Sequence, residues 1–293
     1  NKGERKNKFL SLDGGYHGDT FGAMSVGYSS GYYKPFKDFL LDTNFIPFPE
    51  FWNGNNEIEK NETLVLERVD RILDKDSKDT AAVIIEPLVQ GASGMRICRK
   101  EFLNSMVKKI QDRGIIVIFD EVMTGFGRTG KMFALDHLEV VPDIVCLAKS
   151  LTGGCIPLAA TVFSNDIHNA FISDDIQKAF LHGHTFSANP VACSAAIASL
   201  EVFENEKTFR NIKAISNIHK EYLIKLSKHV NISKIRTIGT IAAFDLNNFP
   251  KRYGSEGSLI LKKEFLNNGL LIRPIGNTVY LMPPYCIDYD VLK

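Results

Sequence analysis

The sequence predicts an α/β fold, in which a large domain built on a mostly parallel β-sheet flanked by helices precedes a smaller α+β domain. Two apolar runs, Ile115–Phe119 and Ile144–Ala148, are bounded by turn-forming residues, which is typical of strands buried on both faces of a parallel sheet. A third run, Ala81–Ile85, is followed by the amphipathic stretch Lys100–Arg113, which leads into the first run and predicts a β-α-β unit with a right-handed crossover. From Lys207 onward helices and strands alternate differently, which favours a separate small domain.

The other elements follow from the same periodicities. We expect further strands at Phe9–Leu12, at Ala159–Phe163 and within Ile235–Leu246, and further helices at Asn61–Asp74, Val191–Glu206, Ile212–His229 and Ser255–Asn267. Residues 28–62 are rich in aromatic residues and proline without clear periodicity, so we expect an irregular segment that packs over the site. The change of pattern divides the chain into two predicted domains, residues 1–206 and residues 207–293.

Composition and charge exclude several classes of protein. The chain has 293 residues, of which 44% are apolar and 24% charged, and its net charge of +1 provides no field for nucleic acid or for an anionic membrane. No apolar run approaches the length of a membrane-spanning helix. The 5 cysteines are scattered, odd in number and without a Cys-x-x-Cys pair, which indicates reduced thiols. We therefore expect a cytoplasmic protein whose partners are small molecules.

Charged side chains follow three of the predicted parallel strands at their carboxyl ends. Asp120 and Glu121 come after one strand, Lys149 after the next, and Glu86 after an earlier one. In open parallel sheets, ligand-binding and catalytic sites lie at this edge. A lysine amine with a buried carboxylate suits pyridoxal 5′-phosphate (PLP), because the amine forms a Schiff base and the carboxylate keeps the pyridine nitrogen protonated. Each group also has an ordinary interpretation, since an Asp-Glu pair can cap a turn and a lysine can be a surface group.

Two loops carry motifs of weaker specificity. Asp13–Thr20 contains three glycines beside Tyr16 and His17, which suits either ring stacking or an ordinary turn. Gly125–Gly130 matches the G-x-G-x-x-G dinucleotide fingerprint, but five residues separate it from the preceding strand and no helix clearly follows, so a nicotinamide dehydrogenase is a weak alternative.

Histidine and arginine residues elsewhere give less specific signals. His182 and His184 form a His-x-His pair with no carboxylate or cysteine at ligand spacing nearby, so we predict no metal site. Arg273 precedes Pro274 and could bind a carboxylate in bidentate fashion, or simply lie in solvent.

Together these motifs resemble a known family, the class III (fold type I) PLP-dependent aminotransferases. The block from Phe119 to Gly130, then Pro142-Asp143, then Lys149–Gly154 is similar to the central motif of that family, and the resemblance covers almost the whole chain. Three features favour the branch that transfers the amino group of S-adenosylmethionine to 8-amino-7-oxononanoate in biotin biosynthesis: the loop Gly15–Val26, Met123 in place of glutamine, and the segment Ile272–Tyr285.

The resemblance implies the cofactor and the residues that bind it. Lys149 would form the Schiff base with PLP and carry the catalytic proton, and Asp120 would pair with the pyridinium nitrogen. Tyr16 would lie against the ring and take part in catalysis. The other cofactor-binding residues would be His17, Val122, Glu86 and Thr185, the last reaching the PLP phosphate of a partner subunit in a homodimer with shared active sites.

The resemblance also implies the substrate-binding residues. Arg273 would bind the carboxylate of the keto acid, with Tyr280 in the same pocket. The substrates would further contact Tyr16, Asp19, Lys149 and Gly183. The family further implies roughly a hundred or more residues ahead of Asn1, within ordinary domain size, including a helix N-terminus for the PLP phosphate, and a final helix after Lys293. Two alternatives stay open: a class III aminotransferase with another amine donor, and a truncated, inactive remnant.

Overall fold

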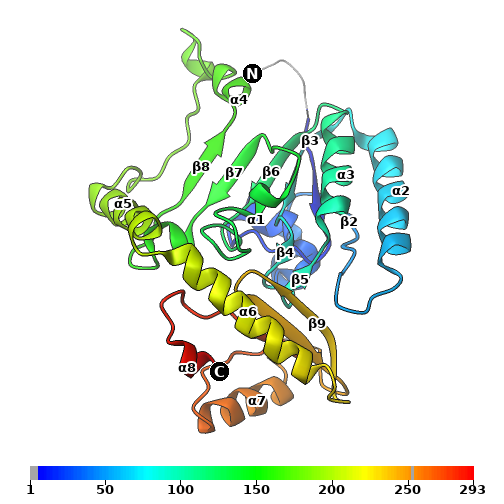
Figure 1. Ribbon diagram of the computed structural model, residues 1–293. Coiled ribbons are helices and arrows are strands. Elements are labelled where there is room, and N and C mark those ends of the chain that lie inside the picture. The colour runs from blue at the N-terminus through cyan, green and yellow to red at the C-terminus, as the bar shows by residue number, and fades with distance from the viewer. Residues whose placement is uncertain (1–5, 252–253) are drawn as a thin grey trace.

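The computed structural model describes residues 6–251 and 254–293 and confirms the predicted α/β architecture around a central sheet (Figure 1). The sheet has six strands in the order β2-β1-β3-β6-β7-β8. Every neighbouring pair is parallel except β7 and β8, which run antiparallel. The strands are β1 (Lys8–Leu12), β2 (Thr43–Ile46), β3 (Thr80–Ile85), β6 (Ile116–Asp120), β7 (Ile144–Leu147) and β8 (Ala160–Phe163).

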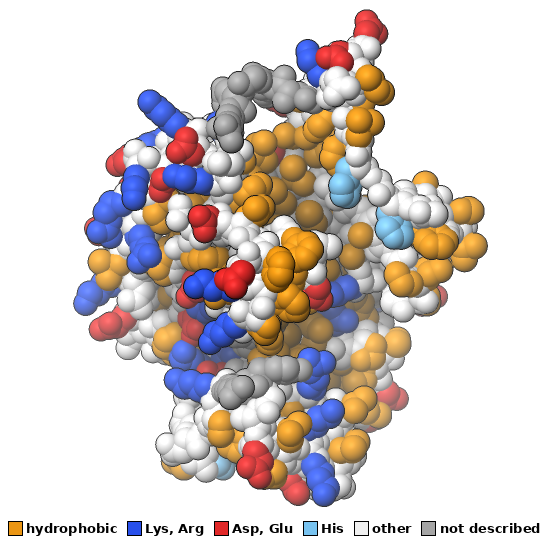
Figure 2. Space-filling view, turned by 180° about the vertical axis from the view of Figure 1, so that it is seen from behind, with side chains coloured by type: hydrophobic (Ala, Val, Ile, Leu, Met, Phe, Trp, Pro, Cys, Tyr) orange, Lys and Arg blue, Asp and Glu red, His pale blue; other side chains and the backbone are white. Residues whose placement is uncertain are grey.

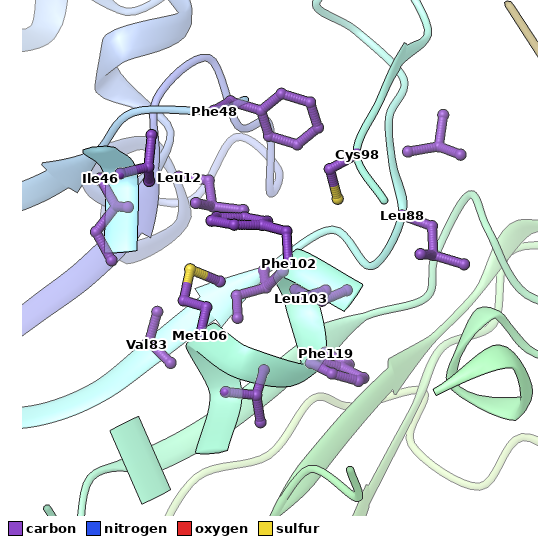
Figure 3. Packing of buried hydrophobic residues seen from close by; sticks show 14 of the residues in the cluster. Leu12, Ile46, Phe48, Val83, Leu88, Cys98, Phe102, Leu103, Met106 and Phe119 are labelled. Carbon is purple, nitrogen blue, oxygen red and sulfur yellow. The ribbon is translucent and has the colours of Figure 1, made fainter. Parts of the chain in front are cut away.

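Two helices pack side by side against this sheet, α2 (Ile58–Asp76) and α3 (Lys100–Gln111). The buried residues of α3 recur at helical spacing, so that one stripe faces the strands while its lysines face solvent. Phe102, Leu103 and Met106 from α3 meet strand residues such as Val83 and Phe119 in a continuous apolar core (Figure 3). Burial of this stripe explains why the β3-α3-β6 unit was predictable.

Shorter helices and turns connect these elements. The α-helices are α1 (Phe21–Val26), α4 (Asn165–Asn169) and α5 (Pro190–Asn205), and the 3-10 helices are Tyr28–Ser30, Lys34–Phe39, Ala134–His137, Lys149–Thr152 (η4) and Ile176–Lys178. In the part of the chain that the structure describes, no helix is both long and apolar enough to cross a membrane.

The C-terminal part forms an antiparallel sheet in the order β11-β10-β9, composed of β9 (Ile232–Ile238), β10 (Ile241–Leu246) and β11 (Thr278–Leu281). Helix α6 (Thr208–Leu226) packs against β9 and β10, and α8 (Tyr289–Leu292) contacts α6. Helix α7 (Glu256–Asn267) lies at the bottom of Figure 1. The chain turns between α5 and α6, and we propose this turn, at residues 206 and 207, as the boundary between the two domains.

Three pairings were not expected from the sequence. Strand β2 lies within residues 28–62, which were predicted to be irregular, and β11 lies in the C-terminal segment. The third is a hairpin of β4 (Val89–Gln90) and β5 (Arg96–Ile97), in a segment for which no strand was predicted. Such two-residue to four-residue strands are too short to show a period, and partners far away in the sequence determine their pairing.

Candidate active site

The predicted acid and lysine lie at the carboxyl ends of neighbouring strands. Asp120 is the last residue of β6 and pairs in register with Cys146 of β7. Strand β7 ends at Leu147, and Lys149 begins the short helix η4 two residues later, with a left-handed φ of 49°. The parallel register therefore places a buried carboxylate and a lysine at the same edge of the sheet, as the sequence predicted.

The carboxylate of Asp120 is held at both oxygens. Its Oδ2 lies 2.8 Å from Nδ1 of His17, and its Oδ1 accepts a hydrogen bond of 3.1 Å from the backbone N–H of Val122. The side chains of His17 and Asp120 are only 2% and 8% exposed, so this pair is shielded from water. His17 thus contacts the carboxylate, a partnership across 103 residues of sequence that no local pattern could reveal.

Glu86 fixes the loop that carries Tyr16 and His17. Its Oε1 accepts from the backbone N–H of Tyr16 and its Oε2 from that of Gly91, each at 3.0 Å. Burial raises the pKa of Glu86 to about 7, and the nearby His17 and the two amide donors only partly oppose this shift. Glu86 therefore lies beneath the loop as an acceptor that anchors it.

Lys149 lines a cavity of about 990 Å³ at this edge. The opposite wall comes from residues 154–159 and from the segment that precedes α5, including His184 and Phe186. Thr185 and Gly183 belong to the same segment and are both exposed. A cavity of this size lies near the upper limit of ordinary ligand and cofactor sites.

A second cavity, of about 1030 Å³, brings together Tyr16, Asp19 and Arg273, three of the predicted substrate-binding residues. The hydroxyl of Tyr16 lies 3.1 Å from Asp19 Oδ1, and that of Tyr33 lies 3.2 Å from the same oxygen and 3.0 Å from the carbonyl oxygen of Gly18. Burial raises the pKa of both tyrosines, so they remain hydrogen-bond donors at neutral pH. The cavity thus has a carboxylate at one wall and a guanidinium at another.

Several residues of this cavity were not predicted from the sequence. Tyr32 and Tyr33 lie beside Tyr16, and the rings of Tyr16 and Tyr33 stack with centroids 6.0 Å apart. They come from the aperiodic segment, where aromatic content was the only available signal. Tyr280, by contrast, packs against the main core, and its predicted contact with substrate stays a prediction.

The glycine-rich loop joins the two domains, and this explains why its fingerprint was misleading. The backbone N–H of Thr240 donates to the carbonyl oxygen of Arg128 at 3.0 Å, and the Arg128 guanidinium donates to the carbonyl oxygen of Pro283 at 2.7 Å. The hydroxyl of Tyr285 donates to the carbonyl oxygen of Phe126 at 2.7 Å. The loop therefore packs against the small domain. The backbone N–H groups of its three glycines, which a pyrophosphate would need, donate instead to the carbonyl oxygens of Glu121, Met132 and Gly127.

A mostly parallel sheet with a buried acid and a lysine at adjacent strand ends, beside two cavities, suits a PLP-dependent enzyme. A model of the class III aminotransferase family matches residues 1–293, and the chain belongs to this family. PLP is the cofactor of the family.

Similar proteins agree with this assignment. The chain is 42% identical, over its full length, to the adenosylmethionine-8-amino-7-oxononanoate aminotransferase of Synechococcus elongatus and covers 68% of that protein. It is 39% identical to the enzyme of the same name from Helicobacter pylori, again over its full length, and covers 66% of it. The chain thus spans about two thirds of the length of these curated relatives.

Solved structures show the same relationship. The adenosylmethionine-8-amino-7-oxononanoate aminotransferase of Methanocaldococcus jannaschii is 35% identical with a TM-score of 0.88, and the match covers 99% of this chain and 66% of that one. An amine transaminase from an uncultivated Pseudomonas species, solved with PLP bound, is 30% identical with a TM-score of 0.89, and the match covers 98% of this chain and 67% of that one.

The residues at this edge suit the cofactor of the family. A carboxylate that is 8% exposed and already paired with His17 provides the anionic partner that a protonated pyridine nitrogen needs. The cavity beside Lys149 is large enough for a phosphorylated pyridine ring. Among the described residues, no group of three or more histidine, cysteine, aspartate or glutamate side chains gathers as a metal site.

Proposed function

We propose that this chain provides the PLP-binding and substrate-binding residues of a transaminase that moves the amino group of S-adenosylmethionine to 8-amino-7-oxononanoate, giving 7,8-diaminononanoate in biotin biosynthesis. The observation that carries the proposal is the register pairing that places buried Asp120 beside the strand followed by Lys149. The names of the similar proteins support the particular substrates.

Each residue at the strand ends has a role in this proposal. When bound, PLP accepts the electron pair released from the substrate carbon and stores the amino group between the two half-reactions. Lys149 Nζ would hold the cofactor and would carry the proton that leaves the substrate carbon bearing the amino group. Asp120, with His17 behind it, would hold the protonated pyridine nitrogen. Val122 and Tyr16 would pack against the ring.

The second cavity is assigned to the substrates. Arg273 binds the carboxylate of the keto acid, because a guanidinium offers two parallel donors to a carboxylate. Asp19, held by the hydroxyls of Tyr16 and Tyr33, faces the cationic amine of either substrate. A chain of apolar carbon atoms between these charged ends fits the aromatic walls that Tyr32 and Phe36 provide.

The test of cofactor attachment is borohydride reduction in the presence of PLP, followed by peptide mass spectrometry. We expect a pyridoxyl group on Lys149, and none on this peptide after Lys149→Ala, which should abolish turnover while PLP still binds without a covalent link. Reduction that labels another lysine, or transamination that persists in Lys149→Ala, would refute the assignment. Failure of the chain to bind PLP, despite a stable fold, would favour a non-catalytic remnant.

The amine donor is tested separately. A panel of S-adenosylmethionine, lysine, ornithine and 4-aminobutyrate, each offered with 8-amino-7-oxononanoate, should give product with S-adenosylmethionine alone. Product from lysine in its place would leave the class of reaction intact and overturn the particular donor.

We further propose a cytoplasmic homodimer in which Thr185 reaches the cofactor of the partner subunit and Gly183 lines the shared substrate site. Phe180, Leu181 and Phe186 are 67%, 75% and 68% exposed around these residues, and Figure 2 shows hydrophobic side chains gathered over α5 and the projecting segment before it. Such a patch is typical of an interface. Sedimentation equilibrium should give a dimer, and Phe180→Ser with Leu181→Ser should weaken it together with PLP affinity.

A further inference from the structure

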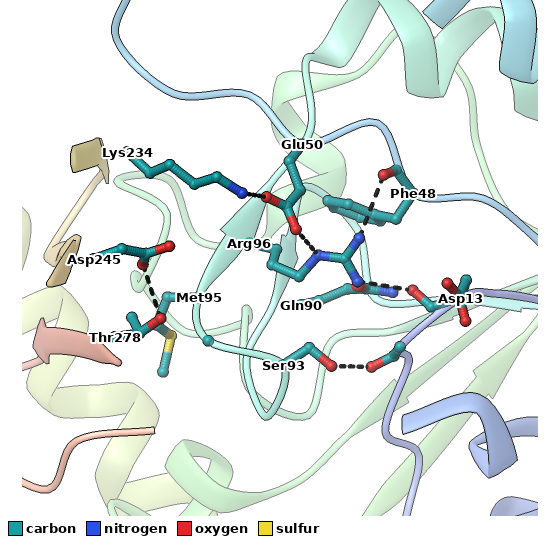
Figure 4. Close-up of polar contacts among 12 residues, drawn as sticks. Asp13, Phe48, Glu50, Gln90, Ser93, Met95, Arg96, Lys234, Asp245 and Thr278 are labelled. Carbon is teal, nitrogen blue, oxygen red and sulfur yellow. Dashed lines mark hydrogen bonds and ion pairs between the residues drawn. The ribbon is translucent and has the colours of Figure 1, made fainter. Parts of the chain in front are cut away.

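The β4-β5 hairpin lies between the loop that carries Tyr16 and the small domain, and polar contacts reach it from both sides (Figure 4). It is an antiparallel pair of two residues on each side, which is too short to be stable by itself. The conformation of the hairpin therefore depends on its contacts with the loop and with the small domain. The positions of these two neighbours depend in turn on the hairpin.

On one side the hairpin holds the start of the Tyr16–His17 loop through backbone carbonyl groups. Nη1 of Arg96 donates to the carbonyl oxygen of Asp13 at 3.0 Å and to Oε1 of Gln90 at 3.1 Å, and the hydroxyl of Ser93 donates to the carbonyl oxygen of Gly14. The packing is close, since a β-carbon on Gly14 would lie 2.5 Å from Nη1 of Arg96. The turn before Tyr16 is therefore fixed by hairpin side chains.

On the other side a buried arginine of the small domain donates hydrogen bonds to the same hairpin. Arg236 of β9 is 4% exposed, and its Nε donates to the carbonyl oxygen of Met95 at 2.8 Å and its Nη2 to that of Gly94 at 2.6 Å. Asp245 of β10 balances the charge at 2.9 Å from Nη2 and also accepts from the hydroxyl of Thr278 of β11 at 2.9 Å. All three strands of the small sheet thus contribute to this contact.

Glu50 links the two sides directly. Its Oε1 lies 2.6 Å from Nε of Arg96, an ion pair in which the N–H is not aimed at the oxygen, and its Oε2 accepts from Nζ of Lys234 at 2.6 Å. The Arg96 guanidinium also lies 4.7 Å from the centre of the Phe48 ring and donates to the carbonyl oxygen of Phe48 at 3.3 Å. Arg96 thus connects the Tyr16 loop, the hairpin and, through Glu50, the small domain.

We propose that Arg96 is a positioning residue of the transaminase, and that the hairpin it anchors sets the place of Tyr16 and His17 relative to the small domain that carries Arg273. The inference rests on the proposed function for its consequence in catalysis. A planar guanidinium directed at two acceptors at once cannot be replaced by the single ammonium of lysine without losing part of this geometry.

The first test needs no cofactor. Hydrogen exchange of the backbone amides of Tyr16 and His17 should become about tenfold faster in Arg96→Gln, because the carbonyl group of Asp13 at the start of their turn loses its donor. Arg99→Gln is the matched control, since Arg99 loses a comparable ion pair with Glu62, at 2.6 Å, between α3 and α2 and away from the loop. Equal exchange at Tyr16 and His17 in both variants would overturn the proposal, even if the protein never bound PLP.

The second test uses the PLP-loaded protein. Arg96→Lys should lower kcat about tenfold to a hundredfold for both half-reactions and shift the absorbance of bound PLP, whereas Arg99→Gln should change neither, because displacement of reacting groups by about 1 Å has effects of this size. Ser93→Ala removes only the bond to Gly14 and provides a milder variant if Arg96→Lys folds poorly. It should show the same spectral shift in smaller degree.

A third variant approaches the hairpin from the small domain. Thr278→Val removes the donor to Asp245 while keeping the side-chain shape, and should raise the KM of the keto acid severalfold more than that of the amine donor, because Arg273 belongs to this domain. Arg96 and Thr278 variants that lose stability but keep wild-type kcat, KM and absorbance would show that the hairpin serves stability alone, and the proposal would fail. Absence of transamination in the unsubstituted protein would contradict the proposed function and leave the exchange result to decide the hairpin.

Discussion

Asp120 is a buried carboxylate that is already paired with a histidine, and its proposed role depends on its negative charge. The His17 contact and the Val122 amide hold both oxygens, so the charge cannot rotate away from the edge where Lys149 emerges. At the residue scale, replacing one carboxylate oxygen of Asp120 by an amide nitrogen keeps the shape of the side chain and removes its charge.

We therefore expect Asp120→Asn to lower kcat about a hundredfold, in line with the loss of one fixed electrostatic partner, while the unfolding midpoint changes little. Steady-state kinetics and urea unfolding measure the two effects. Asp143→Asn is the control, because Asp143 is a half-buried carboxylate just before β7 and accepts the backbone N–H of Val117 at 2.8 Å, at the end of the strands remote from Lys149. Comparable losses of kcat in the two variants would contradict the assignment of Asp120.

His219 provides a residue-scale prediction about pH. It is 2% exposed on α6, neither ring nitrogen has a hydrogen-bond partner among the described residues, and burial lowers its pKa to about 4. The lowered pKa means that the folded protein favours the neutral ring. The contribution of His219 to the free energy of unfolding is therefore complete above the unfolded-state pKa of about 6.5 and is lost as the pH falls toward 4.

Between pH 8 and pH 5 the protonation of His219 in the unfolded chain should lower the free energy of unfolding by about 2 kcal/mol. His219→Leu should remove this part of the pH dependence, which urea unfolding at the two pH values would measure. His168→Gln, at an exposed histidine, should leave it unchanged. An unaltered pH slope in His219→Leu would show that other groups cause the acid sensitivity.

At the scale of elements, Glu121 explains the shape of the segment that follows β6. It is fully buried, and its carboxylate accepts from the Thr124 hydroxyl at 2.6 Å and from the backbone N–H groups of Ala134 at 3.0 Å and Leu135 at 2.8 Å. One side chain thus closes the loop from the strand end to the next helical turn, and burial raises its pKa against these three donors.

Glu121→Gln should destabilise the protein by about 1–3 kcal/mol, because the amide nitrogen cannot accept and leaves a buried N–H unsatisfied. Equilibrium urea unfolding is the measurement. Glu139→Gln, an exposed glutamate in the same region, should change the unfolding free energy by less than about 0.5 kcal/mol. Equal effects would mean that the three hydrogen bonds to Glu121 contribute little.

The elements also show where sequence-based prediction succeeded. The strands before Asp120 and Lys149 were predictable because continuous apolar runs mark their extent, and α3 was predictable from its stripe. The predicted burial on both faces was wrong for β7, whose four residues are all only half-buried. The hairpin, the Tyr32–Tyr33 wall and the His17–Asp120 pair were not predictable, because each depends on partners far apart in the sequence. The spacing of apolar residues shows which face of an element is buried, but it does not show which distant element packs on that face.

At the scale of the whole molecule, the joint between the domains depends on a very close backbone approach. Gly239 has a left-handed φ of 53°, and a β-carbon there would overlap the backbone of Arg128, Thr129 and Gly130. The glycine-rich loop of the large domain and the β9-β10 turn of the small domain therefore fit together only because the turn has no side chain at this position.

Gly239→Ala should lower the unfolding free energy by at least about 3 kcal/mol, since it combines an unfavourable φ with a backbone overlap. Gly269→Ala separates the two causes, because Gly269 also has a positive φ of 77° but no atom within 4 Å of the added carbon, and its cost should stay near 1–2 kcal/mol. Calorimetric unfolding would compare them. Equal costs would show that the domains separate easily enough to absorb the added carbon.

The left-handed backbone of Lys149 has a consequence for how such a protein would change over generations. Lysine in this conformation is disfavoured by about 1–2 kcal/mol relative to glycine, and under the proposed function the need for its amine keeps it there. In a lineage that no longer needs transamination, this constraint disappears and the backbone alone decides the residue. We expect descendants of that kind to carry glycine or asparagine at position 149 more often than arginine, the substitute that charge and size would suggest.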